Sequence, residues 1–458
     1  MKSVKKISVW MFLLVATVWA QVGSTPAQGN SAENSAHMPE NTDTPMLAPP
    51  PVSGQSYPTL YSSSERANYL RGGLAFTGAY TDNALGSVTG RAVSDASYSV
   101  APFIGLDVTT TRLHLLADYA PGFTFYQRTT SRNEADQNAS IDFQYRMSPH
   151  VTLSARDTML KSSNVFNQPN LSEGAVVSGA TQQPNFSVIA PLADRLSNSG
   201  NLGISYQFAP NQMIGVNGTF SNLYYPNPAQ VPGLYDSSSQ GGSAFYSLRI
   251  SKLHYIGASY QYERLVSYPQ VGQNETQTHA LFAFYTLHAT SSLSFSVFGG
   301  PQHYELVQPP VPPLQIQPPV AADWTPAVGG SASWQGRLTN VALTYSHIIS
   351  GGGGLVAAVK MDSASAAIQR QLTRKWSGSI AGGYSQNNVL VSTLGASSGH
   401  TVSGNVSLQR EIGQHINLQA GYIRLHQVYN NVAVFAATPD TNREYISISY
   451  QFSRPLGR

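Results

Sequence analysis

The stretch Glu444-Tyr445-Ile446-Ser447-Ile448-Ser449-Tyr450-Gln451-Phe452, close to the end of the chain, decides the fold. From Ile446 onward apolar residues occupy every second position, and small or polar residues fill the positions between them. A strand directs successive side chains to opposite faces, so this segment has one apolar face and one polar face. The pattern predicts a strand that separates an apolar environment from an aqueous one.

The same alternation recurs from Asn68 onward and predicts about 18 strands. A count of 16 also fits, because the strand boundaries within the segments 276–304 and 350–371 are not distinct. Most segments exceed the ~9–11 residues that a tilted strand needs to cross a membrane. The expected strands are 68–80, 96–107, 111–127, 135–147, 150–161, 197–208, 212–224, 242–251, 253–266, 276–287, 291–304, 324–335, 338–349, 355–371, 375–386, 399–411, 414–427 and 442–452.

The connectors between these segments alternate between very short and long. Ser148-Pro149 and Gly336-Arg337 are short, whereas 81–95, 162–196 and 305–323 are long. Tight turns join antiparallel neighbours, and outer-membrane barrels place tight turns on the periplasmic side and long loops outside. The alternation therefore predicts a closed antiparallel barrel with both termini in the periplasm.

The first 20 residues have the features of a signal peptide. Lys2, Lys5 and Lys6 precede an uncharged apolar run from Ile7 to Trp19, and we expect cleavage after Ala20. The alternative is a membrane anchor, but the run is shorter than the roughly 20 residues of a spanning helix. The leader predicts export from the cytoplasm to the cell envelope.

Residues 21–66 form a second region, rich in Ser, Asn, Gln and Pro and without periodicity. Such a composition buries too little apolar area to offset the entropy of ordering, so we expect a disordered periplasmic tail. The region is too short for a folded plug domain. The barrel is then expected over 67–458.

The composition excludes several classes of protein. Charged residues make up 11% of the chain, against about 25% in a typical soluble domain. The three leader lysines account for the whole excess of 26 basic over 23 acidic residues, so charge gives no support to nucleic-acid binding. The chain has no Cys, which rules out disulfides and thiolate metal sites. A soluble all-β sandwich remains the alternative, and low charge and long strands count against it.

Clean alternation assigns faces to the strands. We expect Ile141, Phe143, Ile204 and Val406 to face lipid, with the polar residues between them facing the lumen. The stretches Leu281–Leu287 and Ala357–Ile368 do not alternate. A bulge, or an apolar contact with a loop that folds inward, would explain either stretch.

On these patterns the segment 67–458 resembles the outer-membrane β-barrel proteins of Gram-negative bacteria, specifically the porin-like group. The sharpest local likeness is the C-terminal assembly signal of that group, matched here by Tyr450 and Phe452. The resemblance implies recognition by the barrel-assembly machinery and a place among outer-membrane lipids. The sequence departs from the pattern because Ser453–Arg458 follow the final aromatic residue.

No motif indicates an enzyme, a cofactor or a metal site. The string Gly395-Ala396-Ser397-Ser398-Gly399 matches a hydrolase elbow in letters only, because that motif needs a strand, a sharp turn and a helix. Gly351–Gly354 lacks the spacing of a dinucleotide loop and is interpreted as a flexible connection.

Charged residues on the expected inner faces are the candidate pore-lining groups. Rings of fixed charge set ion preference in pores, whereas mutual ion pairs would only stabilise the wall. Because both signs occur, the sequence predicts weak ion selectivity. The long loop at 162–196 either folds into the lumen or covers its mouth. The candidate residues are Asp118, Asp142, Arg146, Arg156, Arg249 and Glu263.

These features predict a passive outer-membrane channel for small polar solutes, working as a monomer or a homo-trimer. The alternative is a barrel component of an envelope assembly, such as one that exports exopolysaccharide, with the tail as its periplasmic contact.

Overall fold

The computed structural model describes residues 68–84, 92–164, 192–228, 233–269, 272–290, 292–307, 321–356, 358–390, 398–429 and 440–456. The expected leader (1–20) and tail (21–66) lie outside these residues, as does most of the loops at 162–196 and 305–323. In this part of the chain no helix is long and apolar enough to span a membrane.

The described chain forms 18 strands and one short 3-10 helix, Thr130–Arg132. The strands are β1 (Tyr69–Thr81), β2 (Asp95–Thr109), β3 (Leu113–Tyr126), β4 (Glu134–Arg146), β5 (Val151–Asn164), β6 (Leu192–Ala209), β7 (Gln212–Tyr224), β8 (Asp236–Arg249), β9 (His254–Tyr268), β10 (Asn274–His288), β11 (Leu293–Val307), β12 (Ala321–Gln335), β13 (Thr339–Gly351), β14 (Ala358–Gln371), β15 (Trp376–Val389), β16 (Ser398–Ile412), β17 (Ile416–Tyr429) and β18 (Asp440–Pro455).

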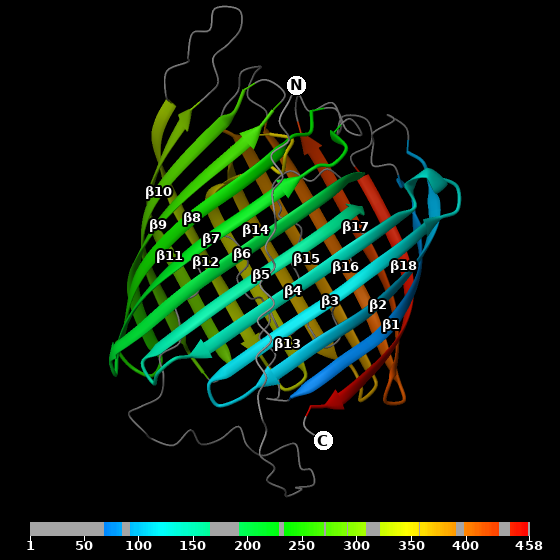
Figure 1. Cartoon of the computed structure of the whole chain (residues 1–458), viewed down its shortest axis with the longest axis horizontal. Helices are drawn as coiled ribbons and strands as arrows, with labels where there is room; N and C mark the ends of the chain where they lie inside the picture. The colour runs from blue at the N-terminus through cyan, green and yellow to red at the C-terminus, as the bar shows by residue number, and fades with distance from the viewer. Residues whose placement is uncertain are drawn as a thin grey trace, which may run out of the picture. The chain divides into compact units, whose positions relative to one another are not determined.

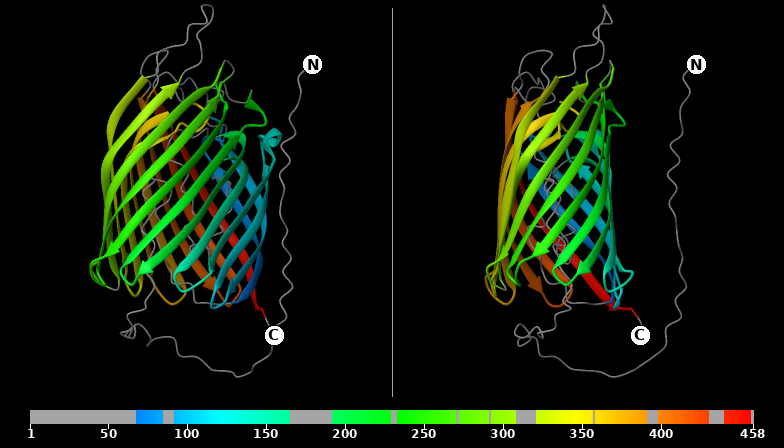
Figure 2. Two further views of the ribbon diagram at one scale, coloured as in Figure 1. Left: turned by 60° about the vertical axis from the view of Figure 1, so that its left-hand side comes forward. Right: turned by 90° about the vertical axis from the view of Figure 1, so that its left-hand side faces the viewer.

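Each strand pairs antiparallel with its neighbours in the sequence, and β1 also pairs with β18, which closes the sheet into a barrel (Figure 1, Figure 2). The closing register runs from Tyr69 opposite Pro455 to Thr81 opposite Arg443. A closed sheet leaves no unpaired edge. The predicted antiparallel barrel is confirmed, and the count is 18 rather than 16. We call the end with the short turns, where β18 finishes, the turn end, and the opposite end the loop end.

Contacts between strands that are not neighbours show which face is inside. Leu265 of β9, Tyr304 of β11 and Leu390, which directly follows β15, pack in one cluster although other strands separate them in the sheet. Such contacts can form only across the interior. Residues directly opposite each other on paired strands share a face, so the register carries this assignment to the other strands. Leu265, for example, lies opposite Ser239 of β8 and Thr276 of β10.

The outer face carries exposed apolar side chains. The exposed fractions of Ile446, Ile448, Tyr450 and Phe452 are 63, 47, 50 and 45%, and the polar residues between them lie on the inner face. These exposed fractions show that the outer wall is apolar, as the alternation predicts. Transfer of such a surface from water into apolar surroundings is favourable.

Three apolar residues predicted to face lipid would lie in the interior if the apolar face of the wall pointed inward. They lie on the outer face instead. Ile204 and Val406 are 45 and 49% exposed, on the face opposite the interior clusters. Phe143 is half-buried and stacks on Tyr145, its neighbour on the same outer face.

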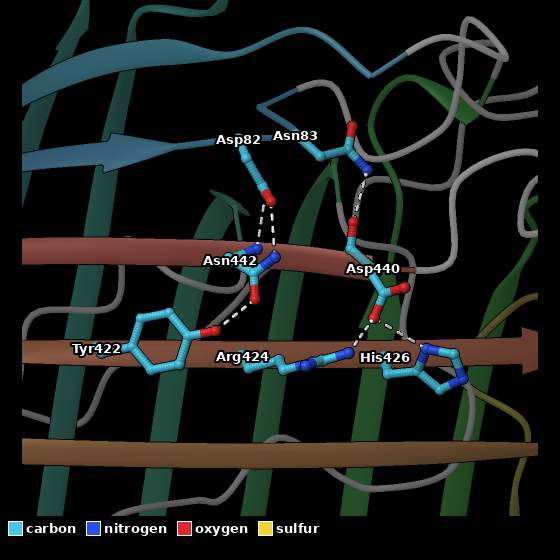
Figure 3. A network of polar contacts seen from close by, with 7 residues as sticks. All are labelled: Asp82, Asn83, Tyr422, Arg424, His426, Asp440 and Asn442. Carbon is cyan, nitrogen blue, oxygen red and sulfur yellow. Dashed lines mark hydrogen bonds and ion pairs between the residues drawn. The ribbon is translucent and has the colours of Figure 1, made fainter.

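The closing seam is tied at both ends. Towards the turn end, Phe452 lies opposite Gly72, and its ring comes within 2.6 Å of the position that a Cβ atom on Gly72 would take. At the loop end, the main-chain N–H and the side-chain amide of Asn442 donate to the carboxylate of Asp82 at 2.7 and 2.6 Å (Figure 3). The hydroxyl of Tyr422 donates to Asn442 Oδ1 at 2.6 Å.

A second set of bonds at this end of the seam centres on Asp440 (Figure 3). Its Oδ1 accepts from Arg424 at 2.9 Å and contacts Nδ1 of His426 at 3.1 Å. The side-chain amide of Asn83 donates to its carbonyl oxygen at 3.2 Å. Side chains of β17, β18 and the residues after β1 are thereby joined.

Two strands begin at least five residues earlier than predicted. β8 starts at Asp236 rather than 242, and β6 starts at Leu192 rather than 197. The first residues of β8 are mostly Ser and Gly, which give no apolar alternation. Hydrogen bonds to β7 and β9 extend the strand over these residues. The local sequence has no strand preference from which this extension could be predicted.

Candidate functional site

The loop-end part of β13 and β14 leaves the barrel wall. Pairing between β12 and β13 stops at Val328 opposite His347. β12 nevertheless continues to pair with β11, as far as Ala321, and β13 continues to pair with β14, as far as Gly351 opposite Ala358. We call residues 348–356 and 358–361 the lumen hairpin. It is free of β12 on one side and can therefore lean into the barrel.

The base of the lumen hairpin packs on the inner wall of distant strands. Ile349 and Ala358 belong to the cluster that holds Tyr304 and Leu306 of β11, with Leu265 of β9 against it. In a continuous wall β12 would separate these groups. The contact shows that the hairpin lies inside the barrel, against β9 and β11.

The tip of the lumen hairpin is bonded to the residues that connect β7 and β8. The Tyr225 hydroxyl donates to the Gly353 carbonyl oxygen at 2.6 Å, and the Tyr235 N–H donates to the Gly354 carbonyl oxygen at 2.9 Å. Burial raises the pKa of Tyr225 to about 12, so its hydroxyl stays protonated and remains a donor at neutral pH.

The glycines at the tip serve a close approach. Gly354 has a φ of 81°, which L-residues rarely adopt. A Cβ atom at Gly354 would lie 2.6 Å from the Tyr235 carbonyl oxygen and would collide with the Tyr225 ring. The run Gly351–Gly354, expected as a flexible connection, thus forms the point at which the hairpin docks.

Apolar contacts at the tip extend across the lumen. Leu355 and Val356 pack against a cluster of buried side chains that contains Tyr225 and also Tyr429, at the end of β17. β7 and β17 lie nearly opposite each other in the strand order of the barrel. The lumen hairpin and this cluster therefore narrow the interior at its loop end.

All the predicted pore-lining residues take inward positions. Asp142 and Arg156 lie directly opposite each other on β4 and β5 and form an ion pair at 2.6 Å, with a second bond from Arg156 Nε at 3.0 Å. The side chains are about a third exposed, so screening by water leaves the pair a contribution of about 0–1 kcal/mol. For Asp142 and Arg156 the structure thus shows mutual ion pairing, the alternative to free charges that set ion preference.

The other predicted lining residues are spread around the lumen. Asp118 of β3 interacts electrostatically with Asp107 of the adjacent β2 and with Arg71 of β1, the next strand along. Glu263 of β9 accepts a hydrogen bond from the Ser239 hydroxyl at 2.8 Å. These groups lie on different sectors of the wall.

Two of the predicted lining residues lie near the turn end. The guanidinium of Arg249 donates to the Pro210 carbonyl oxygen at 2.5 Å. Arg146 is the exposed last residue of β4. Both are remote from the lumen hairpin, so the predicted residues do not form one site.

Neutral hydroxyl groups line much of the remaining inner wall. Ser and Thr side chains on neighbouring strands hydrogen-bond to each other across the ladders, which satisfies these polar groups while leaving lone pairs for water or solute. The pairs are Thr77 with Ser447 at 2.9 Å, Thr344 with Ser365 at 2.6 Å, Ser346 with Ser363 at 2.7 Å, and Ser379 with Ser407 at 2.7 Å.

The inner face also carries apolar side chains, which the expectation of a neutral polar lining did not include. Phe282 and Phe284 of β10 and Phe298 of β11 form a buried cluster, with Ile348 of the lumen hairpin against it. No register shift interrupts Leu281–Leu287 in the pairing with β9. Of the two explanations for this stretch, inward apolar contact is therefore the one observed.

Sequence reasoning missed the residues that hold the hairpin, namely Tyr225, Tyr235 and Gly354. The available signals were the four consecutive glycines and the loss of alternation between Ala357 and Ile368. Neither signal names a docking partner. Among the described residues, no group of three or more His, Asp or Glu side chains is placed to hold a metal ion.

Comparisons with known proteins find only distant similarity, and only among solved structures. No family model matches, and no curated protein matches. Solved structures with similarity include the outer membrane protein opdK from Pseudomonas aeruginosa, at 9% identity and a TM-score of 0.40 over 84% of this chain and 99% of that chain. OccAB4 from Acinetobacter baumannii matches at 8% identity and a TM-score of 0.39 over 85 and 99%.

A third match is the FrpB iron transporter from Neisseria meningitidis, at 7% identity and a TM-score of 0.37. It covers 79% of this chain, which spans 62% of the length of that one. At scores this low the neighbours transfer neither a substrate nor a mechanism to this chain.

Proposed function

We propose that the chain is an outer-membrane channel through which small polar solutes diffuse passively, with its aperture set by the lumen hairpin. The proposal rests on a single observation, namely a closed wall whose outer and inner faces differ in polarity. The outer face is apolar, and the inner face carries hydroxyl, amide and charged groups. A wall of this kind is stable only with lipid outside and water inside.

The connectors support an orientation. The short turns would face the periplasm and the loop end the exterior, because outer-membrane barrels keep long loops outside. A barrel of this strand number has room for an aqueous path unless something narrows it. The lumen hairpin occupies part of that room, so only small solutes would pass beside it.

The mechanism needs no chemical step. A solute would exchange hydrogen bonds with water for bonds with the hydroxyl pairs of the wall, such as Ser346 with Ser363 and Ser379 with Ser407. Because these groups already satisfy each other, they would bind solute weakly and release it readily. Charged groups of both signs would add a modest ion preference.

Liposome swelling and planar-bilayer recording test the proposal. The refolded full chain should permeabilise vesicles to small sugars, with a swelling rate that falls steeply as sugar size increases, and should conduct ions in steps. Vesicles that contain the folded barrel but stay impermeable to ions and to the smallest sugar would remove the proposal.

A further inference from the structure

The lumen hairpin brings one cation into the interior. The ammonium nitrogen of Lys360, on β14, lies 5.1 Å from the ring centroid of Tyr304, on β11. In the sheet, β12 and β13 separate these two strands. The contact can exist only inside the barrel, where the hairpin lies against β11. Lys360 therefore lies inside the barrel, between the hairpin and the inner wall of β11, at the level where the hairpin narrows the interior.

The charge of Asp142 is neutralised by an ion pair, whereas Lys360 has no ion-pair partner among the described residues. Asp142 is paired with Arg156, and Glu263 accepts a hydrogen bond from Ser239. Within the described part of the chain no carboxylate forms an ion pair with Lys360, and the contact of its ammonium group is the cation–π contact with the Tyr304 ring. An aromatic face stabilises an ammonium group without neutralising its charge.

The surroundings of Lys360 are uncharged across the ladder and partly open to solvent. Its cross-strand neighbours are Ile349 on β13 and Asn388 on β15, neither of which carries charge. Ile349 and Tyr304 are buried, and Lys360 itself is half-buried. The ammonium group thus contacts the Tyr304 ring while its partial exposure lets water and ions approach it.

We propose that Lys360 is a selectivity-determining residue of this channel and gives it a preference for anionic solutes. The inference rests on the proposed function and specifies the class of solute that the constriction favours. A fixed positive charge in a narrow passage raises the local concentration of anions and lowers that of cations. Acting across roughly 8 Å of water, a unit charge changes each concentration by about two-fold at low salt.

Reversal potentials in a salt gradient across a planar bilayer test the proposal. The unmodified chain should favour chloride over potassium. Lys360→Met, which keeps the apolar stem against Tyr304, should lower the chloride-to-potassium permeability ratio by roughly two- to four-fold at low salt. Lys360→Glu should invert the preference, and Lys360→Arg should preserve it.

Lys161→Met is the matched control, because it removes the same charge from the exposed outer face of β5. It should leave the reversal potential unchanged. Far-ultraviolet circular dichroism and resistance to unfolding in detergent would show that each variant is folded. Conducting Lys360→Met and Lys360→Glu channels with an unchanged reversal potential would overturn this inference, whereas a folded unmodified chain without conductance would overturn the proposed function.

Discussion

Replacing Gly354 by alanine should release the lumen hairpin and widen the channel. At a φ of 81° an alanine costs about 1–2 kcal/mol more than glycine. The added Cβ atom would also approach the Tyr235 carbonyl oxygen to 2.6 Å and overlap the Tyr225 ring. These contacts are relieved only if the tip moves away.

Movement of the tip breaks two hydrogen bonds, those of Tyr225 to Gly353 and of Tyr235 to Gly354. Each is worth about 0.5–1.5 kcal/mol net and opposes undocking in the unmodified chain and the variant alike, so the change in the balance comes from the added strain of about 1–2 kcal/mol and from the Cβ clash. Since about 1.4 kcal/mol is a factor of ten, the strain alone should lower the ratio of docked to undocked hairpin by roughly 5- to 30-fold, and the clash should lower it further.

Single-channel recording and swelling with sugars of graded size measure the consequence. Gly354→Ala should raise the mean conductance and the largest sugar admitted. Gly413→Ala is the control, because Gly413 has a similar φ of 74° in a tight turn with nothing near its Cβ position. It should keep the conductance of the unmodified chain. Equal conductance of Gly354→Ala and Gly413→Ala would refute the assignment of the hairpin as the constriction.

Three further predictions concern single contacts. Tyr225→Phe removes only the 2.6 Å hydrogen bond to Gly353, so it should raise the conductance in the same direction as Gly354→Ala but by less; a lower conductance would argue against docking through this hydroxyl. Asp142→Asn leaves Arg156 without its ion-pair partner and should shift the reversal potential towards anion preference at low salt. The free energy of unfolding should change by no more than about 1 kcal/mol, because water screens the pair. A shift towards cation preference would contradict the inward placement of both residues. Phe452→Ala uncovers Gly72 at the closing seam and should lower the urea midpoint of unfolding in lipid vesicles by an amount equivalent to roughly 2–4 kcal/mol, whereas an unchanged midpoint would show that the ring does not hold the seam.

The strands could be predicted because their period of two is written in the sequence. For β7 the expected range 212–224 and the observed Gln212–Tyr224 coincide. The loop-end start of β8 could not be predicted, because its Ser and Gly residues have no preference for either face. That part of the strand depends on hydrogen bonds to its neighbours, which are far away in the sequence.

The inward charges could be predicted by the same alternation, but the constriction could not. By alternation Lys360 shares a face with Ile368, which is 44% exposed on the outer wall, so sequence reasoning would place Lys360 towards lipid. Only the separation of β13 from β12 beyond His347 turns this face onto the inner wall of β11. Such a separation depends on tertiary contacts with Tyr225 and Tyr235, which no local pattern encodes.

The role of Tyr450 and Phe452 in assembly stays a prediction. Both side chains are exposed on the outer face of β18, and β18 continues beyond them to Pro455. This position leaves the aromatic rings accessible to an assembly factor from the outside of the barrel.

Site-specific labelling tests the orientation of the wall most directly, because the chain has no natural cysteine. Ile448→Cys and Ser449→Cys place single thiols at adjacent positions of β18 whose side chains lie on opposite faces of the wall. In lipid vesicles, a fluorophore at position 448 should be quenched by a quencher in the acyl chains, and the thiol at 449 should react with a small water-soluble reagent. Lipid quenching at 449 together with aqueous reactivity at 448 would contradict a barrel with lipid outside and water within.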